Sequence, residues 1–347
     1  MKVLYICFTD FDNINRGSAV RPYKMYNAFI NRGYEVILIN GNVQERRKKF
    51  IHSKKNNHLE NIDYCYIEPS TYPCHPIDYL MFIYIKSLNI PVGLFYRDMY
   101  HKFPELFNKK GIKKMELLIR YKFDWSIYKI ISKTIFFPSD SMAKYFKFDN
   151  KAALPPAGEI VNVKKESLQY NVIYVGGVSK RYGTDKLLEA MQIVNDTFKR
   201  INLILVCRDY NDTFFKKYKN EDWLSIKHVS GVELEQFYSK SDVAVIPIEE
   251  IEYHNFAVPI KLFEYLSYNM PIITTNCFET ARFVRNNQIG IVTNDNAQEL
   301  AEAIIKLYKN DNEIFKYTNN SKKTLINGNL WGHRVDKIEK YLLDVHD

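Results

Sequence analysis

The densest group of residues that could carry chemistry lies near position 260, where Pro259 precedes an apolar segment that ends at Pro271. Pro259 predicts the start of a helix, which puts Glu264 in its second turn. A carboxylate there can accept hydrogen bonds from both vicinal hydroxyls of a ribose, while free N–H groups at the helix start, at Ile260 and Lys261, face a phosphate. The alternative is that Glu264 is a solvated glutamate favoured by the helix dipole.

A loop with matching chemistry follows the predicted strand Asn171–Val175. Gly177 is the second of two glycines that leave this strand, and Lys180 and Arg181 lie in the loop before a helix predicted to begin at Thr184. A diphosphate needs backbone N–H groups at close range and a cation for its charge, and this loop provides both. The alternative is a surface loop with solvated cations.

Gly17 and Ser18 lie in a comparable turn between the first predicted strand and a helix. Small residues at such a turn let the backbone approach a ligand, and the helix start favours anionic groups. With only one glycine, the dinucleotide fingerprint G-x-G-x-x-G is absent. The alternative is an ordinary strand–helix turn. Arg208, which follows the predicted strand Asn202–Cys207, is a further donor-binding candidate.

Arg97 and Asp98 follow the predicted strand Pro91–Tyr96. Ligands of parallel α/β sheets bind at the carboxyl ends of the strands, so both side chains are expected to face a cleft. Asp98 is the leading candidate for orienting an acceptor hydroxyl, with Arg97 beside it. The alternative is a structural Arg97–Asp98 pair that caps the loop.

The elements that must position these residues are short apolar runs that alternate with longer helical segments in both halves of the 347-residue chain. Such alternation is typical of parallel sheets covered on both faces, and the chain is long enough for two domains. The predicted strands are Lys2–Phe8, Glu35–Asn40, Asp63–Glu68, Pro91–Tyr96, Thr134–Phe137, Asn171–Val175, Asn202–Cys207, Leu224–Val229, Val243–Pro247, Pro271–Thr274 and Gly290–Thr293.

The cluster Leu154–Gly158, rich in proline and glycine, is typical of a domain hinge. We therefore expect an N-terminal domain over residues 1–156 and a second domain over 157–329. Apolar residues at helical spacing after the break at Gly328 predict a separate terminal helix within 330–347.

The net charge of +9 is the unusual bulk property of a chain whose hydrophobic (46%) and charged (26%) contents are ordinary. Cations concentrate in two segments, 46–55 and 109–122. Such patches can attract nucleic acid, an anionic membrane or a phosphorylated acceptor. No recognised nucleic-acid-reading motif accompanies them, so no nucleic-acid partner is expected. The alternative is compositional bias towards Lys, Asn, Ile and Tyr.

No segment approaches the roughly eighteen uninterrupted apolar residues that a membrane helix needs. The apolar run Met1–Phe8 is too short for a signal peptide and Asp10 follows it closely, so we expect a cytoplasmic protein. The five cysteines form no C-x-x-C pair, which argues against a zinc site or a disulfide framework. Buried, reduced thiols are expected at Cys7, Cys65 and Cys207.

The segment 111–132 has apolar residues at helical spacing with lysines beside them. The interpretation we favour is a core helix that packs on the sheet ahead of the strand at Thr134. The alternative is a membrane-facing amphipathic helix that brings an enzyme to a lipid-linked acceptor. The apolar residues concerned are Ile112, Met115, Ile119, Phe123, Ile127 and Ile130.

Taken together, these segments resemble family 4 glycosyltransferases, which have the GT-B fold. The resemblance is carried by PIKLFEYLSYNMPIITT (259–275), by its lead-in VELEQFYSKSDVAVIP (232–247) and by NVIYVGGVSKRYGTDKLLEAM (171–191). GSAVRPYKMYNAFINRGYEV (17–36) and the helix at Trp331 fit the same pattern. The resemblance covers nearly the whole chain and is more specific in its second half.

This resemblance implies two Rossmann-like domains whose parallel sheets face across a cleft, and a C-terminal helix that packs back on the N-terminal domain. It implies a retaining transferase of the hexosyltransferase type, without a metal or other cofactor. The second domain would bind the nucleotide-diphosphate sugar and the first would bind a hydroxyl acceptor, glycan or lipid-linked, in surface polysaccharide or glycoconjugate assembly. Peripheral contact with the inner face of the cell membrane fits such an acceptor.

One departure from the family pattern concerns the donor sugar. The family usually carries a second glutamate eight positions before the one that matches Glu264, and here that position is Phe256. Glu252, His254 and Asn255 are the candidates to replace its hydrogen bonds. Alternatively, the transferred sugar has fewer hydroxyls to hold.

Another departure concerns the diphosphate. The family usually places an arginine and a lysine at positions that are Gly177 and Tyr182 here, and Lys180 and Arg181 lie inside that window as candidate substitutes. In the retaining mechanism the leaving diphosphate accepts the acceptor proton, so no protein nucleophile is required. Catalysis then depends on positioning and on stabilising the departing charge.

Three other functions stay open at this point. The missing glutamate suggests a non-catalytic glycosyltransferase-like subunit of a heteromeric enzyme. A GT-B epimerase would need no acceptor, and a basic nucleic-acid-binding protein would use the cationic segments.

Overall fold

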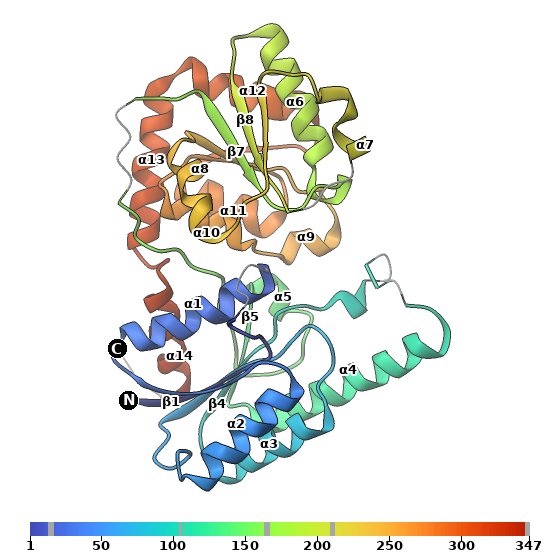
Figure 1. Cartoon of the computed structure of the whole chain (residues 1–347), viewed down its shortest axis with the longest axis vertical. Coiled ribbons are helices and arrows are strands. Elements are labelled where there is room, and N and C mark those ends of the chain that lie inside the picture. Colours follow the sequence, from blue (N-terminus) through green and yellow to red (C-terminus); the bar gives the residue numbers. More distant parts are fainter. Residues whose placement is uncertain (13–16, 104–105, 108, 163–166, 209–211, 344–347) are drawn as a thin grey trace. The chain divides into compact units, whose positions relative to one another are not determined.

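A computed structural model of the chain describes residues 1–12, 17–103, 106–107, 109–162, 167–208 and 212–343. The chain divides into two compact units, Met1–Pro155 with Trp331–Asp347 and Pro156–Leu330. Within the described residues, each unit contains one parallel sheet of six strands with helices on both faces (Figure 1). The predicted α/β class, with two Rossmann-like halves, is confirmed.

The first unit contains a sheet whose four inner strands are buried along almost their whole length, whereas its two edge strands are partly exposed. Their near-continuous apolar sequences produce this burial because helices cover both faces. The strand order is β2 (Glu35–Asn40), β1 (Lys2–Cys7), β3 (Tyr64–Glu68), β4 (Val92–Phe95), β5 (Thr134–Phe137) and β6 (Lys151–Ala153). The edge strand β6 was not predicted.

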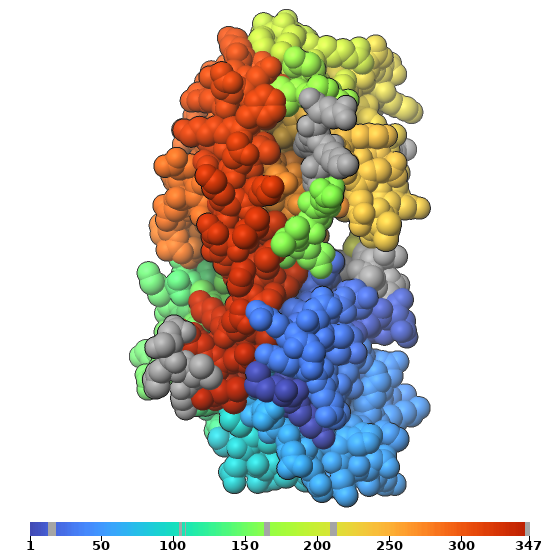
Figure 2. Space-filling view, turned by 90° about the vertical axis from the view of Figure 1, so that its left-hand side faces the viewer, coloured from blue at the N-terminus to red at the C-terminus, as the bar shows by residue number. Residues whose placement is uncertain are grey.

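Helices cover the two faces of this sheet unequally (Figure 1). One face carries α1 (Gly17–Asn31) and α14 (Trp331–Leu342), which lie side by side on the surface of the unit (Figure 2). The other face carries α2 (Val43–Lys55), α3 (Pro76–Ser87) and α4 (Gly111–Ile131), and the short helices η1 (Tyr100–Lys102) and α5 (Asp140–Ala143) lie in the connections. The predicted return of the C-terminal helix to the N-terminal domain is confirmed.

The guanidinium group of Arg46 joins α2 to α3. It donates from Nε and Nη2 to the two carboxylate oxygens of Asp78 at 3.0 and 2.9 Å, with both side chains buried. The guanidinium also lies 3.7 Å from the centre of the Phe8 ring. The interpretation of segment 46–55 as a surface patch of cations is therefore wrong for Arg46, because a buried bidentate pair needs this charge.

The apolar stripe of α4 also differs from its interpretation. Ile112, Met115 and Ile119 are exposed. The side of α4 that faces the rest of the unit is instead lined by residues that include Tyr121 and Tyr128. The favoured assignment of this stripe to the core is wrong.

The second unit has a sheet of the same kind. Its strand order is β12 (Gly290–Thr293), β11 (Ile272–Thr275), β10 (Val243–Ile246), β7 (Asn171–Val175), β8 (Asn202–Val206) and β9 (Leu224–Lys227). All six were predicted, two with the same bounds and four with ends that shift by one or two residues. Because β10 pairs with β7, the order in which the chain adds strands reverses between these two, which is where ligands of such sheets bind.

Two separate apolar cores hold the helices of this unit against the sheet. One is formed with α6 (Thr184–Thr197) and α12 (Ala297–Lys309), and the other with α8 (Glu235–Ser239), α10 (Ile260–Ser267) and α11 (Phe278–Asn287). The remaining elements are η2 (Lys180–Tyr182), α7 (Asp212–Phe215), η3 (Lys216–Tyr218), η4 (Gly231–Leu234), α9 (Glu252–Phe256) and α13 (Asp311–Ile326).

The cysteines are buried and free of disulfides, as predicted for three of them. None of the helices in the described ranges has the length and apolar character needed to cross a membrane.

Candidate functional site

The start of α10 and the turn after β7 come together in the second unit, although about 85 residues of sequence separate them. The Nζ of Lys261 lies 4.3 Å from the centre of the Tyr174 ring. A Cβ built on Gly176 would lie 3.3 Å from the same nitrogen. The backbone N–H of Val175 donates to the Tyr265 hydroxyl at 3.0 Å, which fixes the end of β7 against α10. A cation and a glycine turn are thus adjacent.

Lys261 has an unusual electrostatic environment. Burial lowers the pKa of its ammonium group to about 7, and the nearby carboxylate of Glu264 opposes this shift. An amino group whose pKa is lowered by burial gains a proton readily when an anion binds beside it. Lys261 is therefore suited to neutralise an incoming phosphate.

Glu264 lies one turn after Lys261, and its carboxylate is held by a side chain from another helix. The Tyr238 hydroxyl donates to its Oε2 at 3.1 Å. Tyr238 is itself buried, and its ring is stacked on Tyr268 with the centroids 4.6 Å apart. Glu264 is half-buried, so it is not the freely solvated glutamate of the alternative interpretation.

The loop that carries Lys180 and Arg181 lies against α9. Nε of Arg181 donates to Nε2 of His254 at 3.4 Å, and Nδ1 of the same ring lies 2.7 Å from the carbonyl oxygen of Glu249. This pair of contacts requires a neutral ring that carries its proton on Nδ1. Burial is the main cause that lowers the pKa of His254, in agreement with the neutral form. Lys180 is exposed beside this arrangement.

Gly183 allows the same loop to approach β10. Its φ of +67° is in the left-handed region, and a Cβ at this position would collide with the carbonyl oxygen of Pro247. Only glycine satisfies both conditions. This approach places η2 next to the carboxyl end of β10.

The three candidates for replacing the family glutamate have different environments. Oδ1 of Asn255 accepts from the backbone N–H of Phe278 at 2.9 Å, so this side chain caps the start of α11. Glu252 is exposed, and His254 is engaged by Arg181. Phe256 is buried and packs on the Tyr253 ring at 5.0 Å between centroids.

Arg208 and Ile260 complete the predicted set in this unit. Arg208 is exposed after β8, and its carbonyl oxygen lies 3.1 Å from Nδ1 of His228. Ile260 is the half-buried first residue of α10. Gly177 is exposed after β7, with the Tyr182 ring close to its Cα. The structure thus brings Gly177, Lys261 and Glu264 to one region, and Arg181 and His254 to another at the same edge of the sheet.

In the first unit, Arg97 meets a buried carboxylate that the sequence did not single out. Nη2 of Arg97 is 3.5 Å from Oε2 of Glu68, and Nε of Arg21 is 3.3 Å from Oε1. The Tyr66 hydroxyl donates to Oε1 at 2.9 Å, and the Arg21 guanidinium lies 3.6 Å from the centre of the Phe95 ring. Glu68 therefore holds two guanidinium groups at the carboxyl ends of β3 and β4.

Asp98 lies beside this network. Its Oδ2 accepts from the Thr71 hydroxyl at 2.8 Å, and it is half-buried. The ring of His101 is stacked on Tyr121 at 4.2 Å, and burial lowers the pKa of His101 to about 4. The Tyr121 hydroxyl donates to the carbonyl oxygen of Thr71 at 3.0 Å. Asp98 is thus positioned by a threonine on the neighbouring connection.

Two predicted residues cannot be placed in full. Gly17 and Ser18 are the first residues of α1, but their side chains lie outside the described residues, as does Arg16 before them.

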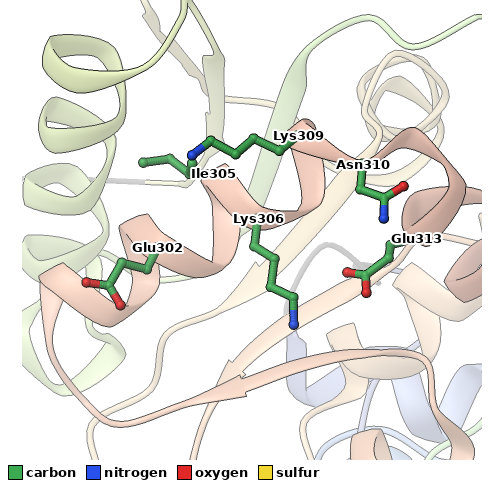
Figure 3. Close-up of a pocket in the computed structure, with 6 residues that line it drawn as sticks. All are labelled: Glu302, Ile305, Lys306, Lys309, Asn310 and Glu313. Atoms are coloured by element: carbon green, nitrogen blue, oxygen red, sulfur yellow. The ribbon is translucent and has the colours of Figure 1, made fainter.

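Within the part of the chain that the structure describes, no group of three or more His, Cys, Asp or Glu side chains is arranged to hold a metal ion. A surface hollow of about 560 Å³ lies along α12 and the start of α13, away from the predicted site residues (Figure 3). It is lined by Glu302, Ile305, Lys306, Lys309, Asn310 and Glu313.

Residues 169–310, which contain every predicted donor-binding residue of the second unit, match the family model described as glycosyl transferases group 1. Over this segment the second unit is similar to the group 1 glycosyltransferases. The resemblance inferred from segments 171–191, 232–247 and 259–275 is therefore confirmed. No curated protein sequence matches the chain closely enough to count as a relative.

Solved structures extend the similarity of fold beyond residues 169–310 to the whole chain. Sucrose-phosphate synthase from Thermosynechococcus elongatus has a TM-score of 0.67 at 14% identity, covering 98% of both chains. The Anabaena protein HepE in complex with UDP has a TM-score of 0.68 at 11% identity, covering 99% of this chain and 100% of that one. WaaG, a glycosyltransferase involved in lipopolysaccharide biosynthesis, has 0.61 at 14%, covering 98% and 99%. The chain has the GT-B fold of these proteins.

Two residues of this glycosyltransferase fold were missed from the sequence. Glu68 ends a buried strand, and an acid at that place is a signal that could have been used. Tyr238 gave no signal, because 26 residues separate it from Glu264 and nothing in the spacing connects them.

Proposed function

We propose that the chain is a retaining glycosyltransferase that moves a sugar from a nucleoside-diphosphate sugar to a hydroxyl group of an acceptor. The observation that carries the proposal is the convergence of Glu264, Lys261 and the Gly176–Gly177 turn at one edge of the second sheet. This convergence lies inside the segment that matches the group 1 family.

The ribose and the diphosphate of the nucleoside-diphosphate sugar each have a partner in the proposed site. The Glu264 carboxylate accepts from the ribose hydroxyls, with its orientation held by Tyr238. Lys261 and the backbone N–H groups of the glycine turn bind the diphosphate. Arg181, which His254 orients, and the exposed Lys180 add positive charge from the neighbouring loop.

The proposed reaction needs no nucleophile from the protein. The bond from the anomeric carbon to the diphosphate oxygen breaks as the acceptor oxygen forms its new bond on the same face of the sugar. The departing diphosphate oxygen takes the proton of the acceptor hydroxyl, so the configuration is retained. Asp98 orients that hydroxyl, and Lys261 and Arg181 stabilise the departing charge in the way that a metal ion does in other transferases.

A thermal-shift panel of nucleoside diphosphates and their sugars is the first test. A ligand at about a hundredfold its dissociation constant stabilises the protein by about 2.7 kcal/mol, which such a measurement resolves easily. We expect one nucleoside diphosphate and its sugars to stand out. If no member of the panel stabilises the protein, donor binding is contradicted.

Retention and metal independence have tests of their own. With the donor identified, NMR of the product gives the anomeric configuration, and inversion would contradict the mechanism. The transfer rate should not change when EDTA is added. A loss of transfer rate that added Mg²⁺ reverses would show that the cationic side chains of the site do not suffice to stabilise the departing charge.

The proposed acceptor is a glycan or a lipid-linked saccharide of surface polysaccharide or glycoconjugate assembly, reached by peripheral contact with the membrane. Its support is a similarity of fold to WaaG, a glycosyltransferase involved in lipopolysaccharide biosynthesis, together with the cations of segment 109–122. Transfer to extracted lipid-linked saccharides, compared with transfer to free sugars, tests the acceptor class. A preference for free sugars would contradict it.

One observation favours a second candidate, a non-catalytic subunit that stabilises an active partner. Phe256 replaces the family glutamate and is buried against Tyr253, so it offers no hydrogen bond to a donor sugar. Hydrolysis of the donor by the isolated chain, in the absence of acceptor, separates the two functions. Measurable hydrolysis that Lys261→Met abolishes would exclude the subunit role.

A further inference from the structure

The outward side of α4 carries a stripe of exposed apolar residues, which Glu116 and Ser126 interrupt. Successive residues of a helix are rotated by about 100°, which places the exposed stripe opposite the buried side formed by Tyr121, Asp124, Tyr128 and Ile131. The exposed residues and their fractional exposures are Ile112 88%, Met115 62%, Ile119 63%, Phe123 50% and Ile130 64%. The side of this helix towards the protein is therefore mixed polar and apolar, whereas the side away from the protein is mainly apolar.

The neighbouring helix α3 continues the same surface. Leu80 is 64% exposed and Ile83 53% exposed, whereas Phe82 and Ile85 on the opposite side of α3 are buried. The rings of Tyr79 and Phe123 pack edge to face with their centroids 4.9 Å apart and join the two helices. Figure 1 shows α3 and α4 together on one side of the first unit. Their outward residues form one surface, which we call the α3–α4 apolar face.

Cations flank the stripe on α4. Lys122 and Lys129 lie about a quarter of a turn from the stripe on one side, and Lys113 lies on the other side. All three are exposed, as are Lys109 and Lys110 just before the helix. The acids of α4 are Glu116, which is exposed, and Asp124, which is buried under Tyr79. The surround of the apolar stripe is therefore strongly positive.

We propose that the α3–α4 apolar face binds a membrane surface that contains anionic lipid, with α4 lying in the plane of the interface. Aliphatic side chains in this arrangement enter the boundary between head groups and acyl chains, while flanking lysines extend to the lipid phosphates. Burial of the stripe in the interface removes a contiguous apolar surface from water. A contiguous exposed apolar surface, unlike a single exposed residue, is typical of an interaction site.

Charge decides between a membrane and a second copy of the chain as occupant. Two copies that met through this face would place the lysines of both α4 helices against each other, which is unfavourable, whereas anionic head groups neutralise them. The purpose of the contact rests on the proposed function, since it would bring the glycosyltransferase to a lipid-linked acceptor. The contact itself requires no donor.

The test is flotation of the full chain with vesicles of neutral phosphatidylcholine and with vesicles that also contain phosphatidylglycerol. We expect binding to the anionic vesicles that weakens as salt rises. The pair Ile112→Ser and Ile119→Ser should reduce binding by at least about tenfold, because each isoleucine contributes apolar burial. The pair Lys122→Gln and Lys129→Gln should also reduce it and flatten the salt dependence.

A matched control comes from two exposed aliphatic residues of the second unit. Ile160 and Val232 are 70% and 80% exposed, and their replacement by serine should leave vesicle binding unchanged. Equal binding by wild type and the Ile112/Ile119 pair would overturn the proposal, and so would an absence of binding to either vesicle. A dimer in light scattering that the same pair dissolves would assign the face to a second copy and overturn it too.

Nucleoside-diphosphate binding, measured without vesicles in the same variants, separates this inference from the proposed function. It should be unchanged in every variant of the α3–α4 apolar face. A chain that binds vesicles through this face and binds no nucleotide would support the membrane contact and contradict the transferase.

Discussion

The hydroxyl of Tyr238 donates to Oε2 of Glu264 at 3.1 Å and so connects α8 to α10. Tyr238 is buried and its ring is stacked on Tyr268, which leaves the hydroxyl little freedom to turn elsewhere. In the proposed site this contact fixes the carboxylate before the donor arrives. Such preorganisation lowers the cost of binding a diol.

Replacement of Glu264 tests the ribose contact. Glu264→Gln keeps an oxygen that can accept from Tyr238 but removes the charge, so it separates ligand binding from folding better than Glu264→Ala does. We expect affinity for the nucleoside diphosphate to fall by about tenfold to a hundredfold, which corresponds to about 1.5–3 kcal/mol for hydrogen bonds to a charged group. Affinity for the 2′-deoxy nucleotide should fall much less. Equal losses for the two nucleotides would show that Glu264 does not hold the ribose.

Tyr238→Phe tests whether the tyrosine positions Glu264. Loss of this one hydrogen bond should weaken ribonucleotide binding by about threefold to tenfold and reduce discrimination against the 2′-deoxy nucleotide. Tyr308→Phe is the matched control, because Tyr308 is another buried tyrosine of this unit that donates to a carboxylate, that of Asp242 at 3.4 Å. It should leave both affinities unchanged. If Glu264→Gln changes the discrimination and Tyr238→Phe does not, the tyrosine has only a packing role.

The pKa of Lys261 predicts a proton that accompanies the donor. Burial lowers this pKa to about 7 in the free protein, and a bound diphosphate stabilises the charged form. Above pH 7 the free protein loses a proton that the complex keeps, so binding takes up as much as one proton. Affinity then falls by up to about tenfold per pH unit between pH 8 and 9, where the diphosphate itself no longer titrates.

Calorimetry in buffers that differ in ionisation enthalpy counts these protons. The control is Lys261→Met, which removes the titrating group. It should bind the diphosphate more weakly at pH 7 and show no proton uptake between pH 8 and 9. Proton uptake that persists in Lys261→Met would assign it to another group and contradict the role of Lys261.

The elements of this fold were predictable where burial determines the sequence. Strands such as β10, and β1 after its first residue, are apolar because helices cover both of their faces. Short runs of this kind between helical segments are typical of buried parallel strands. The strand β6 has three residues, Lys151–Ala153, and a run this short carries no pattern. The glycine turn after β7 and the segment at Glu264 could be proposed as a nucleotide site from the sequence, because each has its candidate groups within a few neighbouring residues.

The rest depended on contacts that sequence spacing does not encode. An amphipathic helix reveals that it has an apolar side but not which way that side faces. On α4 the inward side is held by polar groups instead, since Asp124 accepts from the Tyr79 hydroxyl and from the backbone N–H of Cys74. Glu68 and Arg21 likewise come from elements 47 residues apart, and only the folded sheet brings them together.

The buried network around Glu68 gives a prediction about stability. Its carboxylate is a charge partner of both Arg21 and Arg97, and all three side chains are largely excluded from water. Glu68→Gln removes this shared counter-charge, which costs about 3–5 kcal/mol at a buried pair. Hydrogen exchange of β3 and β4 by mass spectrometry measures this loss in the first unit alone. The control is Asp222→Asn, which breaks an exposed ion pair with Arg200 in the second unit. It should change hydrogen exchange in that unit very little. If the backbone amides of β3 and β4 are as well protected from exchange in Glu68→Gln as in the wild type, the network does not stabilise the unit.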